Sequence, residues 1–127
     1  MCTRVLAALA IFLAAAASPA FAQSTDVKFV GQSRATVPLK RDIVTAISGY
    51  SKARHSCGAV SAVETAPLPQ GYEPKTPMFR VSAPEHFYER WVASLCGSQR
   101  TFFVAMWPSP KGGADYKILE ASPGSEP

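Results

Sequence analysis

The stretch from His86 to Trp107 constrains the fold more than any other part of the chain, because it predicts two adjacent strands joined at a turn. Residues 86–95 alternate between apolar and other side chains, and Glu89 is the one charged residue on the apolar side. Residues 100–107 are apolar on both sides, as a central strand is. A helix would cover one face of this strand, and the N-terminal arm, a proline-rich loop or a partner must cover the far face.

The first 22 residues show the three regions of a secretory signal peptide in order. Arg4 supplies an early positive charge, residues 5–17 are apolar, and Ala20-Phe21-Ala22 is a small-residue cleavage pattern. The apolar run is shorter than the roughly 20 residues that a membrane-spanning helix needs. We therefore expect residues 1–22 to be removed, leaving a periplasmic or secreted protein with no stable membrane span.

Removal of the signal peptide would discard Cys2 and leave one cysteine pair, Cys57 and Cys96. In an oxidising compartment an even pair predicts a structural disulfide. A metal pair through His55 and Cys57, or a reactive thiol, is the alternative. No C-x-x-C spacing is present, and Cys96 has no nearby histidine in the sequence, so the disulfide is favoured.

The mature chain of about 105 residues suffices for one domain with a modest core. Residues 23–37 form an N-terminal arm that is either loose or a short edge strand, and residues 122–127 form a polar tail. Between them, residues 38–121 are expected to be a single domain. It would begin with an amphipathic helix over residues 39–54, with Thr36 as a plausible cap and Pro38 in the first turn.

Residues 57–65 and 114–121 are predicted to be strands, and residues 66–84 a long proline-rich loop with a short extended piece at 78–81. If the 57–65 strand runs antiparallel to the 86–95 strand, the two cysteines become neighbours, as a disulfide requires. The predicted fold class is α+β: one N-terminal amphipathic helix packed on a four-stranded antiparallel meander and held by one disulfide.

Charge and motifs restrict the possible functions. The formal charge of +4, or +3 without Arg4, forms no dense basic cluster, so binding of nucleic acid is not expected. His55, His86 and Lys52 could supply the acid, base and electrostatic stabiliser of a small hydrolase, but no spacing requires them to converge. Other candidate residues lack the partners that their chemistry needs: Ser94 and Ser98 as nucleophiles, Glu85 and Glu89 with the histidines as metal ligands. We therefore expect that the protein is not an enzyme and binds no cofactor.

Most of the aromatic residues are expected to lie in the core of the sheet. Tyr88, Arg90 and Tyr116 form a candidate interaction surface. The expected function is therefore a small exported cell-envelope protein acting as a non-catalytic binding or interaction module, whose partner is an envelope protein or a small ligand. The loop at 66–84 or the turn at 108–113 would contact that partner. The alternatives are an inhibitor of a secreted hydrolase, a structural piece of an envelope assembly, and a small histidine-dependent hydrolase.

Overall fold

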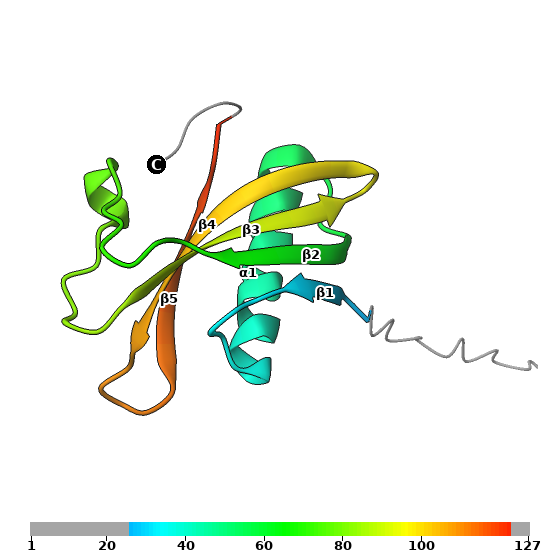
Figure 1. Ribbon diagram of the computed structural model, residues 1–127. Coiled ribbons are helices and arrows are strands. Elements are labelled where there is room, and N and C mark those ends of the chain that lie inside the picture. Colours follow the sequence, from blue (N-terminus) through cyan, green and yellow to red (C-terminus); the bar gives the residue numbers. More distant parts are fainter. Residues whose placement is uncertain (1–25, 123–127) are drawn as a thin grey trace, which may run out of the picture.

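One helix lies across one face of a five-stranded sheet in the computed structural model, which describes residues 26–122 (Figure 1). The predicted signal peptide and most of the predicted tail lie outside the described residues. Strand order follows the sequence, β1 to β5. The elements are β1 (Lys28–Gly31), α1 (Val37–His55), β2 (Val60–Pro67), the short 3-10 helix η1 (Pro77–Phe79), β3 (Phe87–Leu95), β4 (Ser98–Pro108) and β5 (Ala114–Glu120). Within residues 26–122 no helix is both long and apolar enough to cross a membrane.

The fold is α+β as predicted, but the prediction of four antiparallel strands was wrong. The arm contributes a fifth strand, β1, which pairs in parallel with β2 so that Phe29 lies opposite Val63. The chain returns from β1 to β2 through α1, and a helical crossover of this kind makes neighbouring strands parallel. Gly31 permits the close approach, because its φ is +89° and a side chain there would collide with the Thr65 carbonyl.

Helix α1 begins at Val37, two residues before the predicted start, with Thr36 as its N-cap and Pro38 in the first turn as predicted. The Leu39 N–H donates to the Thr36 hydroxyl at 3.5 Å, which satisfies one of the free donors at the helix start. Leu39, Ile43 and Ile47 are buried against the sheet. The predicted apolar stripe is therefore the face that forms the main core.

The proline-rich loop covers the other face of the sheet. Phe79 is buried there with Tyr88, Phe103 and Ala105. Strand β4 is consequently buried on both faces, as predicted for a central strand. The expected extended piece at residues 78–81 was wrong, because residues 77–79 form η1 instead, which places the Phe79 ring 5.7 Å from that of Tyr88.

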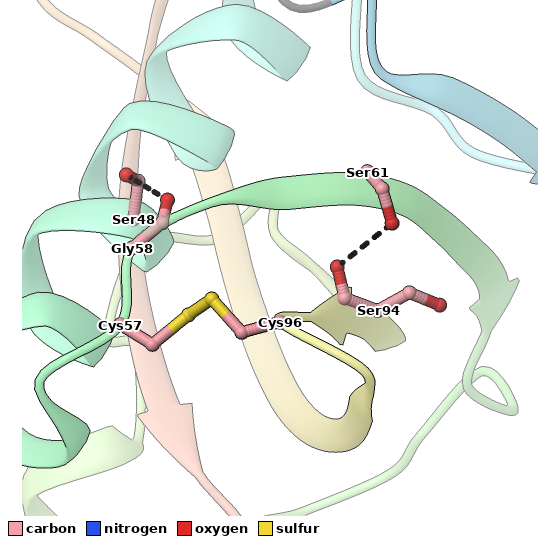
Figure 2. Close-up of a disulfide and its surroundings, with 6 residues drawn as sticks. All are labelled: Ser48, Cys57, Gly58, Ser61, Ser94 and Cys96. Atoms are coloured by element: carbon pink, nitrogen blue, oxygen red, sulfur yellow. Dashed lines mark hydrogen bonds between the residues drawn. A yellow bond between two sulfur atoms is a disulfide. The ribbon is translucent and has the colours of Figure 1, made fainter.

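The predicted disulfide joins Cys57, just after α1, to Cys96 in the β3–β4 turn, with a Cα–Cα distance of 6.4 Å (Figure 2). Cys96 and Gly97 have φ values of +46° and +81°, as the two-residue turn requires. Beside the bridge, the Ser48 hydroxyl donates to the Gly58 carbonyl (Figure 2). The bridge thus ties the helix end to the central hairpin, and it is compatible with an oxidising compartment.

Candidate functional site

Glu89 is a charged residue with no solvent exposure, located near the start of β3. Its Oε1 accepts the backbone N–H of Arg34 at 2.6 Å, and its Oε2 accepts the Ser33 hydroxyl and the Trp91 indole N–H, both at 2.8 Å. Three donors offset the desolvation of a buried carboxylate. Glu89 therefore holds the segment between β1 and α1 against the sheet.

Arg34 has a fixed backbone and an exposed side chain. Its guanidinium carbon lies 4.4 Å from the centroid of the Phe87 ring. The guanidinium N–H groups donate no hydrogen bond to another residue of the described part of the chain, so they can bind a carboxylate. No acidic side chain among residues 26–122 forms an ion pair with Arg34. Its donors are therefore available to an anionic ligand.

Two hollows meet at the Arg34–Phe87 pair, at the end of the sheet where β3 begins. The larger one, of about 350 Å³, is otherwise lined by residues 67–73, 84, 86, 88 and 89. The smaller one, of about 260 Å³, lies between the start of α1 and the β4–β5 hairpin, and its lining includes Leu39, Met106 and Trp107. The proline-rich loop therefore borders the first hollow and the hairpin borders the second.

The structure does not bring the two histidines together. His86 lines the larger hollow, with Nδ1 2.6 Å from the Ala83 carbonyl oxygen and its ring 5.3 Å from the Tyr88 ring. His55 lies at the end of α1, on the opposite face of the sheet, where its Nε2 is 2.9 Å from a Glu120 oxygen. The acid–base pair considered from the sequence is therefore not formed by these side chains.

Glu120 is the centre of a second polar cluster, at the end of β5. Both of its carboxylate oxygens lie within 3.0 Å of His55 Nε2, and Arg100 donates to Oε1 at 3.1 Å. Burial by itself would raise the pKa of Glu120, but the hydrogen bonds from His55, Tyr50 and Arg100 outweigh it and lower the pKa below 4.5. The cluster joins the end of α1 to β4 and β5.

The other residues considered from the sequence are dispersed. Ser98 is exposed in the β3–β4 turn, and the Ser94 carbonyl accepts a hydrogen bond from Ser61 at 3.3 Å (Figure 2). Glu85 is exposed, whereas Glu89 is buried in the contacts described above. In the described part of the chain, no group of three or more His, Cys, Asp or Glu side chains is arranged to hold a metal ion.

The candidate surface of Tyr88, Arg90 and Tyr116 does not form one patch. Tyr88 is buried under the proline-rich loop, where its hydroxyl accepts the Val81 N–H at 3.0 Å. Tyr116 packs on the opposite face, and its hydroxyl donates to the Asp42 carbonyl at 3.1 Å. Burial and the Asp42 carboxylate raise the pKa of Tyr116. Arg90 is exposed on β3, and the role of all three in binding stays a prediction.

Sequence reasoning missed the part played by Arg34, because this residue lies in the arm, which was predicted only to be either loose or a short edge strand. The usable signal was Glu89, a charge on the apolar side of a predicted strand, since a carboxylate in that position must find donors. Trp91 is two residues from Glu89, but nothing local identified the other two donors, Arg34 and Ser33, which lie 55 and 56 residues away in the sequence.

No family model, no curated protein and no solved structure matches this chain. The chemistry of the site is therefore inferred from its own residues, chiefly Arg34, Phe87 and Glu89.

Proposed function

We propose that this chain is an exported, non-catalytic binding module, and that its binding site is the sheet end around Arg34. The observation that carries the proposal is an arginine held on both sides, by the Glu89 contact to its backbone and by the Phe87 ring under its side chain, yet without an acidic partner among residues 26–122. A preorganised cation of this kind binds an anionic group with little loss of side-chain entropy.

Glu89 acts as a structural group in this proposal. Both carboxylate oxygens already accept hydrogen bonds from three donors, and the side chain has no exposure to solvent. A general base must reach the proton that it removes, either directly or through one water. The arrangement therefore supports binding better than proton transfer at this carboxylate.

The test is capture of a partner by the oxidised mature chain, residues 23–127, from an envelope extract. Arg34→Gln removes the cation, and Arg54→Gln is the matched control, because Arg54 is an exposed arginine at the distant end of α1. We expect a stoichiometric partner with the wild type and Arg54→Gln, and its loss with Arg34→Gln. Equal capture by all three proteins, or capture by none of them, would contradict the proposal.

Point substitutions are preferable to deletion of the proline-rich loop. Phe79 in that loop is 3% exposed and packs with Tyr88 and Phe103, so deletion would expose this hydrophobic cluster on the sheet face opposite α1. Loss of binding after deletion would then reflect misfolding rather than the loss of a contact.

A second candidate, an inhibitor of a secreted hydrolase, is favoured by Met78. Its side chain is 88% exposed in η1, next to the buried residue Phe79. The Lys117 ammonium donates to the Met78 and Arg80 carbonyls at 3.3 and 3.2 Å, so the backbone there is held in place. If this candidate is correct, Met78→Glu abolishes inhibition of the target hydrolase and Arg34→Gln leaves it intact.

A further inference from the structure

The two hollows differ in charge, and the difference indicates how a ligand would lie across them. The larger hollow shares Arg34 with the smaller one and is also lined by His86, by the exposed acidic residue Glu73 and by Glu89, whose carboxylate is already hydrogen-bonded. In the smaller hollow, Arg34 is the one ionisable lining residue that the structure describes, and the walls are mainly apolar. An anion is therefore favoured on the smaller side, and a polar or basic segment is favoured on the larger side.

The size and the single cation of the smaller hollow restrict the anion. A volume of about 260 Å³ equals that of about nine waters at roughly 30 Å³ each, which is enough for one large side chain and a carboxylate. One guanidinium edge matches one carboxylate through two parallel hydrogen bonds. A phosphate would carry more charge than this single arginine neutralises.

We infer that the smaller hollow binds the C-terminal carboxylate of a partner protein whose last residue has a large apolar side chain. The carboxylate pairs with the edge of Arg34, and the last side chain packs against Leu39, Met106 and Trp107. The preceding residues cross Phe87 into the larger hollow, where Glu73 favours a basic residue. The inference rests on the proposed function, and it names the part of the partner that is recognised.

A partner chain fits better than a free small acid because the hollows are adjacent and share Arg34 and Phe87 as a common wall. A ligand confined to the smaller hollow would leave the larger one unused. Capture of a terminal carboxylate is also an established way for a domain to recognise the end of a peptide.

The experiment is an NMR titration of the oxidised mature protein with a defined peptide, acetyl-Ala-Ala-Lys-Ala-Phe, as the free acid and as the C-terminal amide. We expect the acid to bind at least about tenfold more tightly than the amide. The free energy of an arginine–carboxylate pair exceeds that of a neutral hydrogen bond by about the amount that a tenfold change in affinity requires. The largest amide shifts should map to Thr36, Gly113 and Ala114. Replacing the terminal Phe of the peptide with Ser should also weaken binding.

Three variants locate the interaction. Arg34→Gln should bind acid and amide equally, and Arg54→Gln should keep the preference for the acid. Ala114→Leu, which fills the smaller hollow from its rim while retaining Arg34, should weaken both peptides. Heteronuclear spectra with wild-type dispersion show in each case that the variant is folded, so that a loss reports on the site.

Several results would overturn the inference: equal affinity for acid and amide, shifts confined to the larger hollow, or no binding at peptide concentrations on the order of 10 mM. Binding of N-acetylphenylalanine as tightly as the peptide would assign the hollow to a small acid instead. If peptides fail while partner capture still depends on Arg34, only this inference is wrong. If capture does not depend on Arg34, the proposed function is wrong as well.

Discussion

At the scale of single residues, Glu89 organises the site although it is absent from the surface. Its carboxylate fixes the Arg34 backbone and the Trp91 indole, so one buried charge links the arm to the centre of β3. The same contact sets the position from which the Arg34 side chain reaches Phe87. Loss of the carboxylate should therefore affect both stability and binding.

Replacing Glu89 with alanine should lower the free energy of unfolding by at least about 3 kcal/mol. Three donors lose their acceptor in a buried or partly buried site, and each such loss costs about 1–3 kcal/mol. Urea denaturation measures the change, with Glu64→Ala on the exposed side of β2 as the control, expected within about 0.5 kcal/mol of the wild type. Equal stability of the two variants would show that Glu89 is not a structural anchor.

At the scale of elements, the proline-rich loop is a structural layer as well as a border of the candidate site. Adjacent residues of η1 have opposite surroundings: Phe79 is 3% exposed and Met78 is 88% exposed. The Arg80 side chain adds a local tie, donating to the Pro74 carbonyl at 2.9 Å. The loop is thus held at Phe79 and Arg80, while the Met78 side chain beside them projects into solvent.

This difference predicts unequal effects of alanine at the two positions. Phe79→Ala should reduce the free energy of unfolding by about 3–5 kcal/mol, the cost of removing a buried aromatic ring. Met78→Ala removes contacts with water only and should change stability by less than about 0.5 kcal/mol. Thermal and urea unfolding of the pair would test this, and a large effect of Met78→Ala would mean that its side chain packs in the folded protein.

The disulfide acts between elements, joining the end of α1 to the β3–β4 turn. Its two cysteines are separated by 39 residues. Closing a loop of this length stabilises the fold by about 4 kcal/mol in the chain-entropy model.

The double variant Cys57→Ser/Cys96→Ser should lose about that amount of stability while keeping the same fold, since the helix and the strands retain their own core. Reduced wild-type protein is the matched control and should unfold at the same urea concentration as the variant. A variant as stable as the oxidised protein would contradict the prediction.

At the scale of the whole molecule, the two polar clusters lie on the sheet face that α1 covers, one at each end of the helix. Glu89 holds the arm near the candidate site, and Glu120 joins the last strand to α1 and β4. The pKa of Glu120 is lower in the folded chain than its ordinary value of 4.5. Its ionised form therefore stabilises the fold above that value, and this contribution is lost as pH falls through the folded pKa.

Glu120→Gln should be less stable than the wild type at neutral pH, and the difference should shrink as pH falls below about 4.5, where the wild-type carboxylate takes up a proton. Chemical denaturation at a series of pH values measures the two curves. Asp26→Asn, which changes an exposed acidic residue before β1, serves as the control. The difference in its free energy of unfolding from the wild type should stay constant across the pH series. If the difference in the free energy of unfolding between Glu120→Gln and the wild type were the same at every pH, the stabilising role of the ionised Glu120 would be contradicted.

The sequence alone determined the features that depend on near neighbours and on cysteine chemistry. The cap at Thr36, the apolar stripe of α1, the alternation in β3 and the pairing of Cys57 with Cys96 were all predicted and are confirmed. Periodicity and capping act within a few residues, so they can be read directly from the order of side chains.

Only the tertiary structure decided what the arm does, which segment covers the second face, and where Arg34 meets Phe87 and Glu89. Strand β1 exists because Phe29 reaches the core beside Trp91, their rings 6.0 Å apart, and the short strand would not be stable alone. The candidate site likewise joins residues more than 50 positions apart. Contacts over such distances carry no local periodicity, because they form only after the helix and the sheet have packed together.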